Sequence, residues 1–305
     1  MTTVLVTGGA GFIGSHLSAA LLNKGYHVRV LDNLIYGKRE WIPVGVEFIE
    51  GDICDIETCR RAVSGVSGVF HCAAMSRSLP SMDNINYCTQ VNILGTQTIL
   101  IAARDAGVKK IIYSGSSTYY GNQPIPHHEY DTKGEFLNAY ALSKHVGEQY
   151  CLLFDKAFDL PCIILRYFNV YGPRQPLVGA YALVMGIFLH HWSQGEPLQI
   201  HGNGQQRRDF IHVNDIVSAN IAAFESQLRH DIFNIGSGIN ISIKELADMI
   251  SSNQVYQARR AGDAESTLAD ISRAQQMLKW NPTISFEEGL NEMIKVTNNS
   301  QADVG

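Results

Sequence analysis

The chain has 305 residues, of which 45% are hydrophobic and 17% charged, and its formal net charge at pH 7 is −5. This composition is typical of a folded globular protein and excludes a largely disordered chain. A negative net charge gives no broad attraction to nucleic acid or to anionic lipid, so neither is expected as a partner.

The sequence indicates neither a membrane anchor nor a metal centre. Its longest apolar run is too short to span a bilayer, and no basic leader segment precedes the first strand, so we expect a cytoplasmic protein without membrane contacts. The six cysteines are scattered without Cys-x-x-Cys pairs or zinc spacing. This pattern predicts reduced thiols in the core and no metal site.

A glycine-rich turn follows the first apolar segment. Residues 2–7 form a short β-branched run, Gly8, Gly11 and Gly14 come directly after it, and a helix is expected to begin at Phe12. Glycines at this spacing allow a tight turn and bring backbone N–H groups close to a pyrophosphate at the helix N-terminus. The position between strand and helix favours dinucleotide binding over an ordinary turn.

The second expected strand, residues 27–31, ends at Asp32, eighteen residues after Gly14. A carboxylate at this distance can bind the ribose hydroxyls of the adenosine half of a dinucleotide, and it would repel a 2′-phosphate. This favours NAD over NADP, although Lys38 and Arg39 nearby leave NADP open. The alternative role for Asp32 is a turn or helix cap.

Further strands are expected, with helices between most of them, at residues 46–50, 68–71, 110–114, 161–166 and 231–235. Such regular alternation predicts an α/β fold with a doubly wound parallel sheet, the Rossmann architecture. We expect residues 1–170, with the returning strand at 231–235, to form the NAD-binding domain. Residues 171–305 should form mainly a smaller C-terminal α/β domain that binds substrate.

The ends of the third and fourth strands are expected at the edge of the sheet where ligands of open α/β sheets bind. Asp52 follows the third strand and could contact the adenine amino group. Ala73 and Ala74 follow the fourth, and their small side chains would let a cofactor approach closely.

Tyr140 and Lys144 form the candidate catalytic pair. They are four residues apart, so on a helix they share one face. A neighbouring ammonium favours the phenolate form of a tyrosine, which could then take a proton from a sugar hydroxyl. A hydroxyl of the Ser-rich segment 114–118 could hydrogen-bond the reacting oxygen and relay its proton toward Tyr140. On spacing alone, a buried tyrosine beside a solvated lysine remains the alternative.

Taken together, these segments resemble the extended short-chain dehydrogenase/reductase superfamily, in its nucleotide-sugar epimerase and dehydratase branch. The resemblance covers nearly the whole chain. Its motifs are, in order, residues 7–17, 32–34, 51–53, 71–74, Tyr140-x-x-x-Lys144, 165–173 and 208–213.

The resemblance assigns a role to each matching residue. Tyr140 would be the catalytic base, Lys144 would bind the nicotinamide ribose, and Ser116 would occupy the family's Ser/Thr position. NAD would be bound by Tyr140, Lys144, Gly8, Gly11, Phe12, Ile13, Gly14, Asp32, Asn33, Asp52, Ile53, Ala73, Ala74, Asn92 and Phe168. A UDP-sugar would be bound by Ser116, Tyr140, Asn169, Gln199, Ile200, His201, Arg208, Arg260, Asp263 and Thr267.

Two positions distinguish among the reactions of this branch. Dehydratases that resemble the chain carry an Asp-Glu pair directly after the Ser/Thr, and UDP-glucuronate decarboxylases keep the Glu. Here these positions are Ser117 and Thr118, which cannot supply that acid and base. The resemblance therefore implies 4-epimerisation, in which Tyr140 deprotonates the 4-hydroxyl as hydride passes to NAD⁺, and the 4-keto sugar turns and takes the hydride back on its other face.

Other readings stay open. The alternatives are an enzyme that eliminates water or carbon dioxide with an unrecognised base, a UDP-glucuronate epimerase, and a non-enzymatic nucleotide-binding sensor. Residues 75–80 depart from the usual epimerase pattern, and the sequence does not separate UDP from dTDP.

Thr267 bears on the choice of sugar. Its position resembles a size gate beside the C2 substituent, where a large aromatic excludes a 2-acetamido group. Since threonine is small, we expect acceptance of UDP-N-acetylglucosamine, alongside UDP-glucose. Family members also pair two long helices from each subunit, here about residues 84–106 and 138–155, which implies a homodimer.

Overall fold

The computed structural model describes residues 2–76, 78–179, 182–259 and 264–302. At its centre is a seven-stranded sheet in the order β10-β6-β5-β4-β1-β2-β3, and every pair of neighbours is parallel. The strands are β1 (Thr3–Thr7), β2 (His27–Asp32), β3 (Glu47–Glu50), β4 (Gly68–His71), β5 (Lys110–Ser116), β6 (Cys162–Tyr167) and β10 (Asp231–Ile235). The predicted α/β fold is confirmed, and the returning strand at 231–235 lies at one edge of the sheet.

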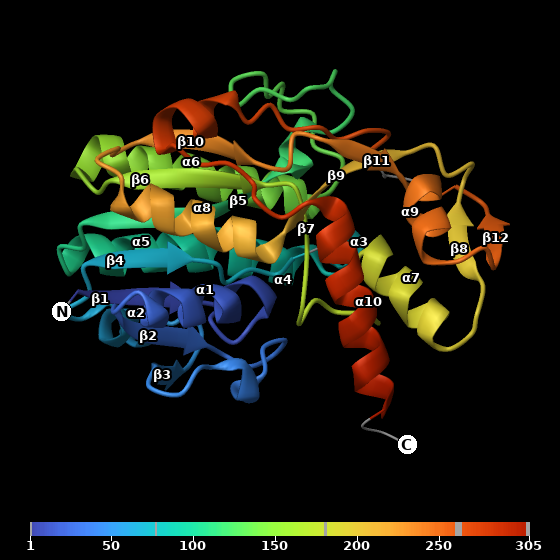
Figure 1. Ribbon diagram of the computed structural model, residues 1–305. Coiled ribbons are helices and arrows are strands. Elements are labelled where there is room, and N and C mark those ends of the chain that lie inside the picture. Colours follow the sequence, from blue (N-terminus) through green and yellow to red (C-terminus); the bar gives the residue numbers. More distant parts are fainter. Residues whose placement is uncertain (1, 77, 180–181, 260–263, 303–305) are drawn as a thin grey trace.

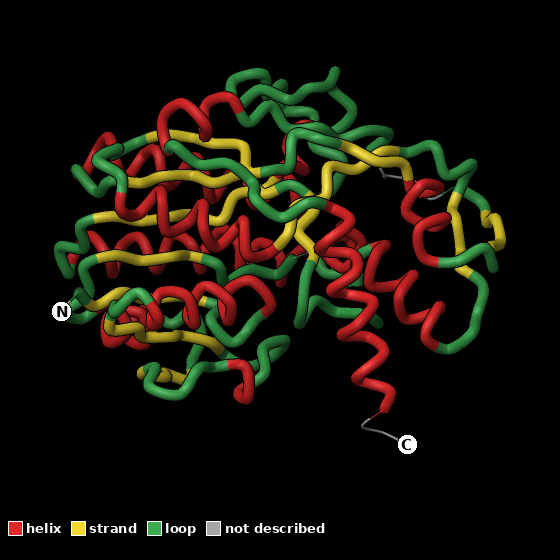
Figure 2. Tube along the Cα trace, viewed as in Figure 1, coloured by secondary structure: helices red, strands yellow, loops and turns green. Residues whose placement is uncertain are grey.

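Helices cover both faces of this sheet, because its strands are apolar on both sides (Figures 1 and 2). Along β1, Val4 and Val6 enter one core while Leu5 enters the other. The first core lies under α1 (Phe12–Asn23) and α8 (Val213–Glu225), and the second under α2 (Ile56–Val63), α5 (Thr96–Asp105) and α6 (Ala139–Phe158). Thus α8 packs on the sheet although it comes from the later half of the chain.

The long helix predicted at 84–106 is present, with one irregularity. Asn84 caps it by accepting a hydrogen bond from the N–H of Tyr87. Helix α4 (Ile85–Thr89), a π-helical segment (Gln90–Gly95) and α5 then follow without a break. A π-helical turn inside an α-helix often marks a functional site, and this one carries Asn92, which holds part of the pocket wall described below.

A smaller part of the molecule lies beyond the carboxyl ends of the parallel strands (Figure 1). It has its own apolar core, which includes Phe188, Leu198, Leu246 and Met293. Its elements are β7 (Asn169–Tyr171), α7 (Val184–Ser193), β8 (Leu198–His201), β9 (Arg207–His212), β11 (Asn240–Ser242), α9 (Ile243–Ile250), β12 (Gln254–Gln257) and α10 (Phe286–Ala302).

Four short elements complete the fold. They are α3 (Ser78–Asp83), the 3₁₀ turns Arg39–Trp41 and Ser117–Tyr120, and a π-helical segment at Ala274–Leu278. Across the described ranges, no helix is long and apolar enough to cross a membrane.

Candidate active site

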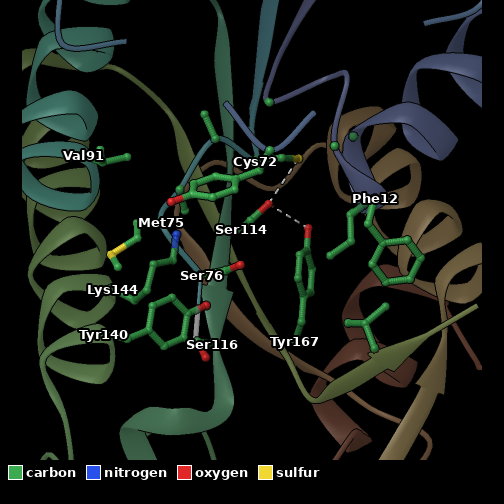
Figure 3. A pocket seen from close by; sticks show the side chains of 18 of the residues that line it. Phe12, Cys72, Met75, Ser76, Val91, Ser114, Ser116, Tyr140, Lys144 and Tyr167 are labelled. Carbon is green, nitrogen blue, oxygen red and sulfur yellow. Dashed lines mark hydrogen bonds between the residues drawn. The ribbon is translucent and has the colours of Figure 1, made fainter. Parts of the chain in front are cut away.

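A pocket of about 610 Å³ opens where the parallel strands end and the smaller part begins (Figure 3). It collects most of the residues that the sequence singled out, although they are spread over more than 250 positions of the chain. Those that line it are Gly8, Gly11, Phe12, Ile13, Gly14, Asp32, Asn33, Asp52, Ile53, Ala73, Ala74, Ser116, Tyr140, Lys144, Phe168, Asn169, Arg208 and Thr267.

The glycine-rich turn brings the N-terminus of α1 to the pocket, while the N–H groups of Gly8, Ala10 and Gly11 are already bonded within the protein. Gly8 has a φ of +69°, and a Cβ there would lie 2.8 Å from the backbone of Ala73. A Cβ on Gly14 would lie 2.1 Å from the carbonyl oxygen of Gly8, so neither site admits a side chain. Gly11 is the N-cap of α1, and no side chain caps the helix there. The first N–H groups of α1 are therefore available to a pyrophosphate, and the turn fits a dinucleotide.

Two carboxylates at the next strand ends are held in place by neighbouring N–H groups. Asp32 accepts hydrogen bonds from the N–H groups of Ala10, at 3.0 Å, and Leu34, at 2.8 Å, while burial raises its pKa. Asp52 accepts from the N–H of Cys54, at 2.8 Å, and from the amide of Asn33, at 2.8 Å. Burial alone would raise the pKa of Asp52, but these hydrogen bonds hold it below its ordinary value.

Asn92 lies behind the pocket wall rather than in its described lining. Its side-chain oxygen accepts the N–H of Met75 at 2.8 Å, and its NH₂ donates to the carbonyl of Met75 at 2.9 Å and to Ser143 at 2.9 Å. It thus joins the loop after β4 to helix α6. Asn92 can position the cofactor wall without contacting the cofactor.

Tyr140 and Lys144 project from the first two turns of α6 into the pocket (Figure 3). The start of α6 is fixed by side chains, since Asn138 accepts the N–H of Ala141 at 2.9 Å and Ser81 accepts the N–H of Tyr140 at 2.9 Å. Lys144 is 2% exposed, and its ammonium nitrogen lies 4.2 Å from the centre of the Tyr113 ring. Burial lowers the pKa of Lys144 to about 8.

Ser116 stands at the end of β5, facing the same space. Its Oγ accepts a hydrogen bond from the N–H of Thr118 at 3.3 Å and lies 2.8 Å from the hydroxyl oxygen of Thr118. Deeper in the pocket, the hydroxyl of Ser114 bonds to the sulfur of Cys72 and to the hydroxyl of Tyr167 (Figure 3). Strand β5 therefore presents two hydroxyls to the pocket, those of Ser114 and Ser116.

The far wall of the pocket is built by the smaller part. Thr267 accepts hydrogen bonds from the N–H of Asp209 and from the amide of Asn169, both at 3.2 Å. Asn169 also donates to the carbonyl of Asp209 at 2.9 Å. Thr267 is thus held in place in the pocket lining by residues of the smaller part.

Not every predicted residue reaches this pocket. Gln199, Ile200 and His201 form β8, and none of them is part of the described lining. Ile200 is fully buried in the core of the smaller part. Arg260 and Asp263 lie outside the described residues.

Other lining residues were missed from the sequence. Tyr36 and Trp41 lie beyond Asp32, Ser76 and Ser78 continue the loop after Ala74, and Arg174 follows β7 with a φ of +68°. The signal for Ser76 and Ser78 was their place just after a strand end on the ligand-binding edge. In the part of the chain that the structure describes, no group of three or more His, Cys, Asp or Glu side chains could hold a metal ion.

Comparison with known proteins gives a consistent picture. The model of the NAD dependent epimerase/dehydratase family matches residues 4–236. A putative UDP-glucose 4-epimerase of Methanocaldococcus jannaschii is 35% identical over 97% of this chain and 99% of its own length. Two solved structures cover 98% of the chain at 34% identity. They are a UDP-glucose 4-epimerase of Thermotoga maritima with UDP-glucose (TM-score 0.94, 100% of that chain) and a UDP-N-acetylglucosamine 4-epimerase of Methanobrevibacter ruminantium with UDP-N-acetylmuramic acid (TM-score 0.92, 99%).

Relatives with other named reactions also match. A UDP-N-acetyl-α-D-glucosaminuronate decarboxylase is 33% identical, and a dTDP-glucose 4,6-dehydratase whose structure holds NAD is 27% identical with a TM-score of 0.92. Overall similarity alone therefore does not separate epimerisation from elimination.

The buried charge of Lys144 predicts a pH-dependent stability. In the folded, nucleotide-free protein its ammonium loses a proton near pH 8, whereas in the unfolded chain it keeps that proton to about pH 10.5. Between these values the unfolded state binds more protons, so stability rises with pH. Below pH 8, burying the charged Lys144 lowers the free energy of unfolding by on the order of 3 kcal/mol. We expect Lys144→Met to unfold at higher urea concentration than the wild type at pH 7. The difference between the two urea midpoints should be smaller at pH 10.

Lys156→Met is the matched control, because Lys156 is exposed on the same helix. It should give no stability gain at pH 7. A Lys144→Met variant less stable than the wild type at pH 7, or a gap constant from pH 7 to 10, would contradict the account of Lys144.

Proposed function

Because the chain belongs to the NAD-dependent epimerase/dehydratase family, we propose that it is a 4-epimerase of UDP-sugars. The observation that carries this proposal is the environment of Ser116. Tyr140, Lys144 and Ser116 converge on one pocket, while Ser117 and Thr118 stand where elimination would need a carboxylic acid and a carboxylate. The site can therefore move a proton on and off one oxygen, and Ser117 and Thr118 supply no second acid-base pair beside it.

The cofactor is NAD. When bound, it would accept a hydride from the sugar and return it, so no net oxidation occurs. The turn at Gly8–Gly14 would hold its pyrophosphate by backbone N–H groups and by the positive end of α1. Asp32 would hold the adenosine ribose hydroxyls.

Within the protein, Tyr140 would take the proton of the sugar 4-hydroxyl and later return it. Below about pH 8 Lys144 is a buried cation one helical turn away, and a cation favours the phenolate form of a neighbouring tyrosine. Ser116 would hold the same sugar oxygen from the strand side. Since proton transfer needs the acceptor within hydrogen-bond reach, the fixed start of α6 is what keeps Tyr140 in range.

The sugar would be placed by the smaller part. Thr267 is small, and its hydroxyl already bonds Asp209 and Asn169, so it leaves room at the far wall of the pocket. We extend the proposal to UDP-N-acetylglucosamine as a substrate alongside UDP-glucose.

A homodimer is part of the same proposal. Helices α4 and α6 pack side by side. Exposed apolar side chains lie on α4, on the π-helical segment that continues it and on α6, namely Ile85 (51% exposed), Leu94 (50%), Leu142 (46%) and Leu153 (51%). On α6, Leu142 and Leu153 are eleven residues apart and so lie on one face of the helix. A second copy of the same pair of helices would bury this surface.

The proposed reaction predicts that Tyr140→Phe greatly slows the conversion of UDP-glucose to its C4 epimer. Loss of a positioned acid-base group lowers kcat by about 10²- to 10⁴-fold. The measurement is chromatography of the sugar nucleotides with mass analysis. Tyr150→Phe, on the same helix but outside the described pocket lining, is the matched control and should stay within about twofold of the wild type. Equal activity of Tyr140→Phe and the wild type would disprove the role of Tyr140.

The gate at Thr267 predicts a change of preference. Thr267→Tyr should lower kcat/KM for UDP-N-acetylglucosamine by about tenfold or more relative to UDP-glucose, because a clash of one substituent is worth several times RT. Thr267→Val removes the hydroxyl but keeps the size, so it separates lost hydrogen bonds from lost space. It should leave the ratio of the two kcat/KM values unchanged. If the ratio in Thr267→Tyr equals the wild-type ratio, Thr267 is not the gate.

The dimer predicts a solution mass of two chains by light scattering. Replacing Leu142 and Leu153 together with Glu should give a monomer, because burying charges in an apolar interface is unfavourable. Val44→Glu is the control, since Val44 is 98% exposed and comes just before β3, an edge strand of the sheet, whereas α6 packs on β5 and β6. A wild-type monomer would rule out the dimer.

A further inference from the structure

The hydroxyls of Ser116 and Thr118 form a closed pair within one turn. The two oxygens are 2.8 Å apart, and the N–H of Thr118 points at the same Ser116 oxygen from 3.3 Å. Among the described residues, neither hydroxyl has another hydrogen-bond partner. Both side chains line the pocket, and Ser116 is the one that the proposed reaction places against the sugar.

Either hydroxyl could be the donor in the bond between them, so the direction of that bond is part of what is inferred. A hydroxyl has one hydrogen to donate and two lone pairs to accept with. The hydrogen of Thr118 has one acceptor within reach in the described chain, the Oγ of Ser116. If it points there, Ser116 accepts from both the N–H and the O–H of Thr118, and its two lone pairs are filled. The hydrogen of Ser116 is then left to point into the pocket.

We infer that Thr118 is a positioning residue that makes Ser116 a hydrogen-bond donor only, directed at the sugar oxygen on which Tyr140 acts. This inference rests on the proposed epimerase function. The sugar oxygen gains negative character as its proton leaves, and again when hydride returns to the 4-keto sugar. A fixed donor at that oxygen stabilises both transition states, and it needs no reorganisation during the reaction.

The inference also selects between two roles for Ser116. A relay would require Ser116 to accept the sugar proton and pass its own to Tyr140. With both lone pairs filled by Thr118, Ser116 cannot accept from the sugar. The proton would instead go from the 4-hydroxyl directly to Tyr140, with Ser116 keeping its own hydrogen throughout.

A purely structural role for the pair is the competing explanation. Ser116 is the N-cap of the 3₁₀ turn Ser117–Tyr120, and its acceptance of the Thr118 N–H is an ordinary capping bond. In that case the Thr118 hydroxyl would only stabilise the turn. Removing it would then lower kcat by the same factor with or without the Ser116 hydroxyl. The two explanations therefore differ in whether the two hydroxyls act as one unit.

A double-mutant cycle on the NAD-loaded enzyme tests this directly. The variants are Thr118→Val, Ser116→Ala and the double replacement, with Thr118→Ser as the rescue that restores a hydroxyl. Thr118→Ala is a second variant in case valine strains the turn. The measurements are kcat and KM for C4 epimerisation of UDP-glucose, affinity for UDP by calorimetry, and the thermal midpoint.

We expect Thr118→Val to lower kcat by about 10- to 100-fold, the loss typical of one hydrogen bond to a group that becomes charged. KM and UDP affinity should stay near wild type, and Thr118→Ser should recover most of kcat. In the Ser116→Ala background, removing the Thr118 hydroxyl should lower kcat by less than about a further twofold, because the effects of residues that act as a unit are not additive.

Additive losses, or a Thr118→Val enzyme with wild-type kcat, would overturn the inference and leave the proposed function standing. A failure of the proposed function gives a different result. If the wild type binds UDP but makes no C4 epimer from UDP-glucose or UDP-N-acetylglucosamine, both fall together.

Discussion

The buried ion pair between Arg166 and Glu148 is the constraint on which the site depends. Arg166 is on β6 and Glu148 on α6, both are at most 2% exposed, and the shortest contact between the charged groups is 2.6 Å. The same guanidinium donates to the hydroxyl of Tyr120, at 2.8 Å, and to the carbonyl of Glu129, at 2.7 Å. Removing either partner would leave an uncompensated charge in the core, at a cost of about 3–5 kcal/mol.

This ion pair links the two halves of the proposed catalytic group. Glu148 lies on α6 four residues after Lys144 and eight after Tyr140, so the three share one face of the helix. Arg166 sits beside Gly115 in the register of β5 and β6, one residue from Ser116. A Cβ on Gly147 would lie 2.3 Å from the hydroxyl of Tyr113, so the helix approaches β5 closely there. The helix that carries the base is thereby fixed against the strand that carries the serine.

The fold was largely predictable because its signals are local. Runs of apolar residues mark each parallel strand, and the glycines after β1 mark a turn in which Gly8 and Gly14 leave no room for a side chain. The same reasoning placed Asp32, Asp52 and Ala73 at one edge, since parallel strands end on the same side. Contacts between distant segments were not predictable. Nothing in the spacing showed that Arg166 would find Glu148, or that Asn92 would bond to Met75 instead of lining the pocket.

The substrate side of the pocket was the hardest part to predict. Its wall is made of loops and short strands whose order in space does not follow from periodicity. Residues Gln199, Ile200 and His201 of β8 were expected to bind the UDP-sugar, but they lie outside the described lining. Thr267 lies in the pocket lining, but its bonds to Asp209 and Asn169 appear only in three dimensions. By contrast, the identity of Ser117 and Thr118 after Ser116 is a local fact that can be read from the sequence, and the proposal of epimerisation over elimination rests on it.

The central claim is that one hydride leaves C4 and returns to the same carbon. Its most direct test is incubation of the purified protein with UDP-glucose carrying deuterium at C4, in ordinary water, with the product examined by mass spectrometry and NMR. The account predicts a C4 epimer of unchanged mass with deuterium still at C4. A product that has lost its deuterium to the solvent, or one lighter by water, would contradict it.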